Sequence, residues 1–219
     1  MKKQVKIYPF ILYFLILILL PFYSYAQERT FGLKGGLNLA SLSIEDVSDA
    51  NILPGFHGGA WVNIPLSGDI SLQPELLYSG KGVEAVYDEE FLGIEIAEGE
   101  TKIRLNYIDI PVYVNYNLSE DFHFFIGPYV GFLLNANINT SAEILDFLDY
   151  TNQDKISKDE FKSTDFGLSG GLGFSIDPVS FGFNYSLGLM TVATDESQME
   201  ALLESSKNNV IQVFVGIHF

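Results

Sequence analysis

The sequence predicts an all-β fold: an eight-stranded, closed, antiparallel up-and-down β-barrel that crosses a membrane. Three observations lead to this prediction. Eight segments alternate apolar and polar residues with period two, which is the pattern of strands with two different faces. Their polar faces consist mostly of small uncharged residues, as the narrow interior of a small membrane barrel requires. The connections alternate strictly between short and long, which is typical of a barrel with turns at one end and loops at the other.

The first 26 residues have the three parts of a secretory signal peptide. Lys2, Lys3 and Lys6 precede an apolar run over residues 7–22, and Ser24 and Ala26 form a small-x-small cleavage site. The run is shorter than the roughly 20 residues that a helical span needs. We therefore expect cleavage after Ala26, with residues 27–219 as the barrel domain.

Bulky residues recur on one face of each predicted strand, and Gly, Ser, Asn or Gln recur on the other. In the first strand, for example, Phe31, Leu33, Leu37 and Leu39 share a face. Segments of about ten residues match a tilted strand that crosses hydrocarbon. In chain order, the eight strands are predicted at residues 31–39, 56–64, 70–79, 102–117, 122–135, 165–176, 179–189 and 211–219.

The connections predict how the barrel sits in the membrane. Residues 65–69, 118–121 and 177–178 form tight turns, whereas residues 40–53, 81–101, 136–164 and 190–208 form long connections. In outer-membrane barrels the short turns are periplasmic and the long loops are extracellular. We expect the same orientation here, with both ends of the barrel on the periplasmic side.

The composition excludes several classes of protein. The 219 residues include 28 Asp and Glu against 12 Lys and Arg, for a formal charge of −16, whereas a nucleic-acid-binding protein needs a basic face. Hydrophobic residues make up 47%, which is too many for a disordered acidic chain. The absence of Cys excludes disulfides, thiolate metal sites and a Cys nucleophile. We therefore expect no nucleic-acid partner, no cofactor and no metal.

A soluble sandwich of two sheets is the alternative fold for such alternation. Two features count against it. The apolar face is wide and aromatic on every strand, and no strand shows the charges that protect the edge of a soluble sheet. The opposite face is small and polar, whereas a solvent-exposed face is usually charged.

Four segments carry a resemblance to a known family. Residues 31–38 (FGLKGGLN), 72–78 (LQPELLY), 107–112 (YIDIPV) and 125–129 (FIGPY) resemble the PorT-like outer-membrane β-barrel family of Bacteroidota. The resemblance implies a small eight-stranded outer-membrane protein, and a role in secretion or envelope assembly. The last residue, Phe219, follows alternating apolar residues and is similar to the signal that the barrel-assembly machinery reads.

Charged residues on the polar faces form a predicted cluster inside the barrel. Lys34, Glu75 and Asp109 point inward from the first, third and fourth strands, and Arg104 lies near the loop end of the fourth. Buried charges must be paired, so we interpret the cluster as structural. A narrow ion or small-solute channel lined by these charges stays open as an alternative.

The three histidines, His57, His123 and His218, are the candidates for a catalytic base. Some small outer-membrane barrels modify lipid with a His, a Ser and an acid. No nucleophile motif accompanies these histidines, and His123 and His218 fall on the turn side of the barrel. We expect no enzymatic activity, and a lipid-modifying enzyme remains the second alternative.

The long connections are where we expect function. The connection at residues 81–101 is acidic and is predicted to continue its strands as a hairpin that could contact a partner or a cation. The sequence further predicts an apolar helical face at 141–150 and a short capped helix at 197–206. The acids in question are Asp88, Glu89, Glu90, Glu95, Glu98 and Glu100.

Taken together, the residues predict a non-enzymatic outer-membrane protein that acts as an envelope scaffold or a surface-interaction protein. Its expected partners are outer-membrane lipid, the barrel-assembly machinery during biogenesis, and a protein bound through the extracellular loops.

Overall fold

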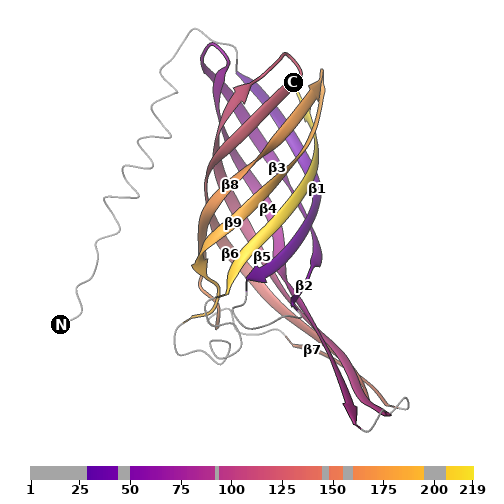
Figure 1. Cartoon of the computed structure of the whole chain (residues 1–219). Coiled ribbons are helices and arrows are strands. Elements are labelled where there is room, and N and C mark those ends of the chain that lie inside the picture. The colour runs from indigo at the N-terminus through magenta and orange to yellow at the C-terminus, as the bar shows by residue number, and fades with distance from the viewer. Residues whose placement is uncertain (1–28, 44–49, 92–93, 145–147, 155–159, 195–205) are drawn as a thin grey trace, which may run out of the picture.

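Ten β-strands form one continuous antiparallel sheet in the computed structural model, and eight of them close into a barrel (Figure 1). The structure describes residues 29–43, 50–91, 94–144, 148–154, 160–194 and 206–219. The barrel strands are β1 (Thr30–Ser43), β3 (Leu53–Ser67), β4 (Ile70–Phe91), β5 (Ile94–Asn117), β6 (Phe122–Ile144), β8 (Thr164–Ile176), β9 (Val179–Thr191) and β10 (Lys207–His218). The other two described strands are β2 (Ala50–Asn51) and β7 (Leu148–Asp154).

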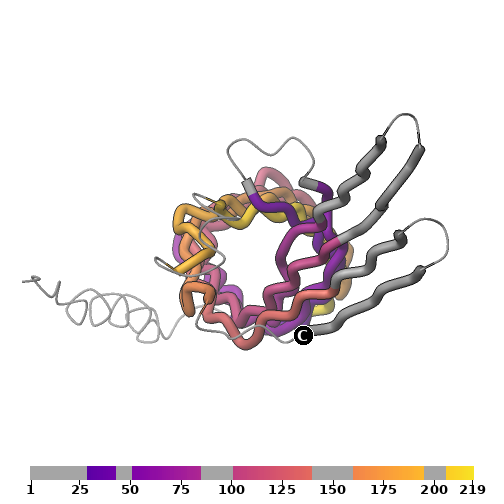
Figure 2. Tube along the Cα trace, turned by 90° about the horizontal axis from the view of Figure 1, so that it is seen from below, coloured from indigo at the N-terminus to yellow at the C-terminus, as the bar shows by residue number. Residues whose placement is uncertain are grey.

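Every predicted strand has its counterpart, so the eight-stranded up-and-down barrel is confirmed. β1 closes the ring because it pairs with β3 on one side and with the last strand, β10, on the other. Figure 2 shows the resulting ring from its end. The predicted signal peptide at residues 1–26 lies outside the described residues and stays a prediction. Among the described residues, no helix is long and apolar enough to span a membrane.

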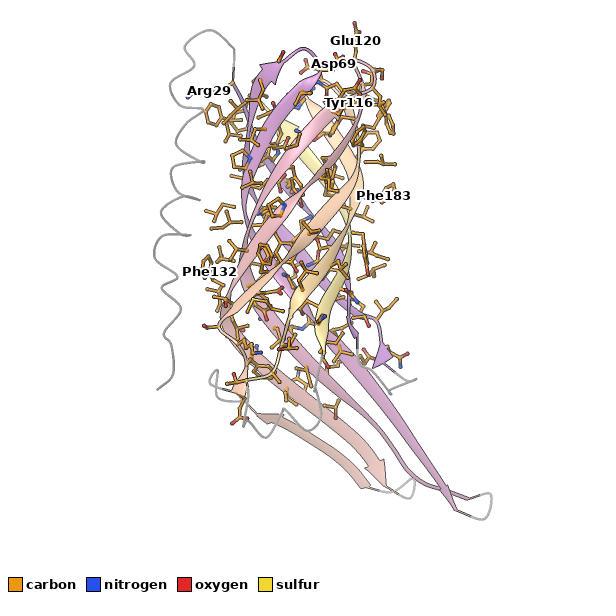
Figure 3. All side chains as sticks on the ribbon, turned by 60° about the vertical axis from the view of Figure 1, so that its left-hand side comes forward. Arg29, Asp69, Tyr116, Glu120, Phe132 and Phe183 are labelled. Carbon is orange, nitrogen blue, oxygen red and sulfur yellow. The ribbon has the colours of Figure 1, made fainter. Side chains whose placement is uncertain are left out.

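The two faces of the wall follow the period-two pattern. Leu37 is 66% exposed, whereas the next residue, Asn38, is fully buried. The same contrast separates Phe183, at 53% exposure, from Asn184, at 1%. Figure 3 labels Phe132 and Phe183 on the outside of the wall. Large apolar side chains outside and polar side chains inside are the reverse of a soluble barrel, and they fit a wall surrounded by lipid.

Three tight turns lie at one end of the barrel, as predicted. Gly68 takes a φ of 53° in the β3–β4 turn, a conformation that favours glycine. In the β5–β6 turn, the Leu118 N–H donates to the carbonyl of Phe122 at 2.8 Å. Asp69 and Glu120 mark this end in Figure 3. We call it the turn end, and the opposite end the loop end.

Three barrel strands continue far beyond the wall at the loop end. β4 pairs with β3 only as far as Ser79, and β6 pairs with β8 only as far as Phe132, yet β4, β5 and β6 stay paired with one another. β7 then adds to the far side of β6. We call residues 84–91, 94–102, 139–144 and 148–154 the blade, which projects from the barrel in Figure 1. The predicted hairpin extension of residues 81–101 is confirmed as part of it.

The prediction of an apolar helical face at 141–150 is wrong for its described residues. Ile144 ends β6 and Leu148 begins β7, and the two are register partners. A spacing of four places two residues on one helix face, but it also places them opposite each other across a tight hairpin. Pairing with β6 decided between the two. The predicted helix at 197–206 lies outside the described residues, except for Ser206.

An apolar cluster fills the lumen at the loop end. Its members come from β1, β4, β5 and β6 and from the segments around Phe161 and Val192, which an isolated bridge between Phe161 and Ala193 holds together. The cluster comprises Leu42, Val83, Ile103, Leu105, Tyr107, Leu133, Ala136, Phe161, Val192 and Ala193.

Candidate functional site

Lys34 and Glu75 form an ion pair inside the turn half of the barrel. The Lys34 Nζ lies 2.5 Å from Glu75 Oε2, and their side chains are 3% and 0% exposed. Gln73 donates from Nε2 to the other Glu75 oxygen at 2.7 Å. The Lys34 ammonium also lies 4.8 Å from the ring centroid of Phe214. Both predicted residues therefore point inward, and each neutralises the charge of the other.

A second ionic cluster lies nearer the loop end and centres on Lys81. Its Nζ lies 3.0 Å from Asp109 Oδ1 and 2.9 Å from Asp165 Oδ2. The Tyr129 hydroxyl and the Asn208 amide each donate to Asp165 Oδ2 at 3.1 Å. We call Lys81, Asp109 and Asp165 the loop-end triad. Three strands, β4, β5 and β8, are tied together by this one lysine.

A glycine makes room for the loop-end triad. Gly131 of β6 is the register partner of Asp109 on β5 and of Asp165 on β8. A Cβ atom at Gly131 would lie 2.5 Å from Asp109 Oδ1 and 3.4 Å from the Asp165 Cβ. Because glycine has no side chain, the middle strand leaves the space in which the two carboxylates approach Lys81.

The triad corrects the predicted cluster in two ways. Asp109 pairs with Lys81, which sequence reasoning placed in a loop, although Lys81 continues the inward alternation of Glu75 and Ser79 along β4. Arg104 is not part of either cluster, because it lies on the opposite face of β5 from Asp109, beside Gly82 of β4. The sequence contains a signal for this, because Arg104 is one residue out of phase with the inward residues Ile103, Leu105 and Tyr107.

A hydrogen-bonded layer separates the two ionic clusters. Asn38 accepts from Gln212 Nε2 at 2.9 Å and donates to the carbonyl of Gly80 at 2.8 Å. Gln212 in turn accepts from Asn184 Nδ2 at 2.8 Å, and Asn184 donates to Ser169 at 3.0 Å. These contacts link the neighbouring strands β1, β10, β9 and β8 along the inner side of the wall, and the bond to Gly80 reaches β4. Such a connected network holds the strands in one register.

A cavity of about 240 Å³ opens at the turn end. Its lining runs from rim residues such as Glu120 and His218 inward to Lys34, Glu75 and Phe214. At its inner end, Tyr113 packs edge-on against Phe125, which also lines the cavity, with ring centroids 4.9 Å apart, and the Phe125 and Phe214 ring centroids lie 6.2 Å apart. The cavity is therefore a vestibule that leads to an aromatic cluster.

The three predicted histidines lie at different levels of the barrel and have different neighbours. His57 is buried, and its Nδ1 lies 2.7 Å from Asn38 Oδ1. His218 Nε2 lies 2.9 Å from Asp177 Oδ1 at the turn end, and His123 lines the vestibule. Neither Asn38 nor Asp177, the hydrogen-bond partners of His57 and His218, is the hydroxyl or thiol nucleophile that such a base would activate. In the part of the chain that the structure describes, no three His, Asp or Glu side chains are grouped to hold a metal.

The predicted acidic residues fall on the blade, where the backbone register brings them opposite one another. Asp88 pairs with Glu98, Glu90 pairs with Glu95, and Glu100 pairs with Val86. Glu89 pairs with Ala97. The row that contains Asp88 and Glu98 continues across the blade to Glu143 of β6 and Asp149 of β7, which sequence reasoning did not single out. Glu143 and Asp149 could not be linked to this row from the sequence, because the row depends on the pairing of four separate strands.

Phe219 lies at the turn end beside the first strand. Its backbone N–H donates to the carbonyl of Phe31 at 2.9 Å, and its side chain is 74% exposed. This places an apolar residue on the outer surface at the end of the barrel wall. Its role as an assembly signal stays a prediction.

Comparison with known proteins gives one family and several similar folds. A family model described as "Outer membrane protein beta-barrel domain" matches residues 25–193. No curated protein sequence matches the chain significantly. Among solved structures, Neisserial surface protein A (NspA) is 12% identical, with 88% of this chain and 100% of that chain covered and a TM-score of 0.46. Ail, the attachment invasion locus protein of Yersinia pestis, is 11% identical, with 88% and 100% covered and a TM-score of 0.45.

Proposed function

The chain belongs to the outer membrane β-barrel domain family, and we propose that it is a non-enzymatic surface-interaction protein whose barrel anchors the blade at the cell surface. One observation carries the proposal. The interior of the barrel is occupied by paired charges and packed side chains, whereas four strands at the loop end extend beyond the wall as a sheet. A closed barrel with a projecting sheet is suited to presenting a surface.

The filling of the interior favours an anchor over a channel. Along the lumen, the vestibule is followed by the cluster of Tyr113, Phe125 and Phe214, then by the layer around Asn38 and Asn184. The loop-end triad and the apolar cluster around Leu105 come next. An eight-stranded barrel is only wide enough for its own inward side chains. Each layer uses inward residues from several strands.

The orientation is part of the proposal. Short turns on the periplasmic side and long connections on the extracellular side are the usual arrangement of outer-membrane barrels, and this would put the blade outside the cell. The resemblance to PorT-like barrels further suggests that the partner belongs to secretion or envelope assembly, and that finer assignment remains our prediction.

The test is photo- or chemical crosslinking on intact cells, followed by affinity capture of the protein. The blade is removed without changing the remaining register: residues 87–99 are replaced by Asn-Gly between the paired residues Val86 and Glu100, and residues 142–150 by Asn-Gly between the paired residues Ser141 and Thr151. A matched control carries Glu120→Gln at the turn end.

We expect a surface partner to be captured by the full chain and by the control, and to be lost with the blade. Heat-dependent gel mobility checks that all variants fold as barrels. Capture that persists without the blade would contradict the assignment of the blade as the interaction surface. Altered lipid A in cells that lack the protein would instead favour a lipid-modifying enzyme.

A further inference from the structure

Among the described strands, β7 is the outermost strand of the blade. Residues 148–154 pair in unbroken register with residues 144–138 of β6, and no described strand pairs with the other side of β7. Every second residue of an edge strand directs its backbone N–H and C=O away from the sheet. Such groups form a template for one more strand.

The edge lacks the usual devices that prevent pairing. The sequence of β7 is Leu-Asp-Tyr-Thr-Asn-Gln-Asp, which contains neither Pro nor Lys. Its register with β6 contains no bulge. Natural sheets usually protect exposed edges with prolines, lysines, bulges or very short strands. At seven residues, β7 is long enough to present several backbone pairs to an incoming strand.

The blade has two unlike faces, because residues paired across strands share a face. One face carries the row Asp88, Glu98, Glu143 and Asp149. The opposite face carries the rows Tyr87, Gly99, Ala142 and Tyr150, and Glu89, Ala97, Ile144 and Leu148. The second face continues the inward positions Val83 and Ile103, which belong to the apolar cluster at the loop end. The register therefore places the acidic row on one face and two mostly uncharged rows on the other.

We propose that the outer edge of β7 receives an extended strand of a partner protein in which basic and apolar residues alternate. The proposal deepens the proposed function and rests on it. Backbone pairing with the free edge supplies the attachment, as in strand addition to other sheets. Basic residues of the incoming strand fall on the acidic face next to Asp149, and apolar residues fall on the face of Leu148 and Tyr150. The two faces of the blade thus specify the two alternating residue types.

Charge argues against a second copy of this chain as the occupant. If two β7 strands paired with each other, they would bring two acidic rows into one sheet, and like charges opposite one another are destabilising. The whole chain carries a formal charge of −16, which also opposes self-association. The same negative charge attracts a basic strand.

The binding test uses short labelled peptides and the full chain refolded in lipid nanodiscs. The probe is a peptide with the length of β7 in which Lys and Val alternate, capped at both ends. The first control has the same residues in two blocks, so charge and composition match but the alternation is lost. The second control replaces each Lys with Glu. Fluorescence anisotropy measures the dissociation constants.

Two proline variants test pairing with the edge. Thr151 and Asn152 are neighbours, so one of them directs its N–H to β6 and the other to the free edge. One of the two single variants, Thr151→Pro or Asn152→Pro, therefore removes an N–H donor on the outer edge without removing a hydrogen bond to β6. We expect that variant to weaken binding of the alternating peptide at least about tenfold. The charge variant Asp149→Asn should weaken it less and reduce its salt dependence.

Each outcome decides the proposal. Preference for the alternating peptide, lost in a proline variant that still folds, supports strand addition at β7. Equal binding of the alternating and block peptides, or binding unaffected by both prolines, overturns it. Blade-dependent capture on cells that both proline variants retain would overturn strand addition while leaving the proposed function intact. Dimers that a proline variant abolishes would identify a second copy as the occupant and overturn the basic partner.

Discussion

Lys81 and Asp165 are 84 positions apart in the chain, and their side chains meet at 2.9 Å inside the barrel. Both side chains are 2% exposed, and Asp109 completes the cluster from a third strand. The contact joins the third barrel strand to the sixth across the lumen, where the two strands share no backbone pairing. The barrel is therefore held by bonds across its interior as well as around its wall.

Removing Lys81 should destabilise the barrel strongly. In Lys81→Met, two buried carboxylates lose their counter-charge, and breaking a buried ion pair by removing one partner costs about 3–5 kcal/mol. Urea-induced unfolding in lipid vesicles measures the loss. The variant Lys81→Met with Asp109→Asn and Asp165→Asn should recover a large part of it, because no charge is left uncompensated. A single variant as stable as the unchanged chain would contradict the role of the triad.

Gly131 should tolerate no larger side chain. Gly131→Val places atoms in the space between Asp109 and Asp165, and overpacking of this kind costs about 1–3 kcal/mol. Gly35→Ala is the matched control, because the nearest atom to a Cβ there is 3.6 Å away, an ordinary contact distance. The measurement compares the free energies of unfolding of the two variants, and we expect a larger loss for Gly131→Val. Equal stability of the two would show that the space beside the triad is not needed.

A charged residue on the outward face of β1 should destabilise the barrel only if lipid surrounds that face. Leu37 lies midway along β1 and is 66% exposed, so Leu37→Arg should cost about 2–4 kcal/mol in a bilayer. Leu118→Arg, at the exposed β5–β6 turn, should cost about 0–1 kcal/mol near the interface. Unfolding in vesicles gives both values. A soluble sandwich would accept either exposed arginine at little cost, so equal and small effects would revive that alternative.

The barrel should conduct no steady ion current. The lumen contains the aromatic cluster of Tyr113, Phe125 and Phe214 between the vestibule and the loop-end triad, with ring centroids 4.9 Å and 6.2 Å apart. Recordings from planar bilayers with the purified chain measure conductance. Steady current that falls in Glu75→Gln or Asp109→Asn would instead support the narrow channel, since those variants remove charge from the lumen.

The strands themselves were predictable from short-range patterns. Alternation of residues such as Leu37 and Asn38 reports which face of a strand meets lipid, because successive side chains point to opposite sides. The same alternation placed Lys34, Glu75 and Asp109 inside, and the lengths of the connections indicated which strands are joined by turns. These features depend on neighbouring residues alone, so a single sequence contains them.

Partnerships across the lumen were not predictable in the same way. The alternation predicts a strand that ends at residue 79, which places Lys81 in a loop, and nothing near Lys81 indicates that Asp165 reaches it. The partner of an inward charge depends on how far the strands are staggered around the closed ring, which is a property of all eight pairings at once. The two acids on either side of Gly131 become neighbours only through that stagger.

By itself, the sequence determined the barrel, its number of strands and the chemistry of its two faces, because period-two alternation and turn lengths are local properties. Only the tertiary structure decided that Asp109 meets Lys81, that Arg104 faces away, and that Ile144 and Leu148 belong to a hairpin and not to a helix. It also decided that Asp88, Glu98, Glu143 and Asp149 share one row. Register between distant strands is fixed by closure of the whole sheet, and no local segment of the chain carries that information.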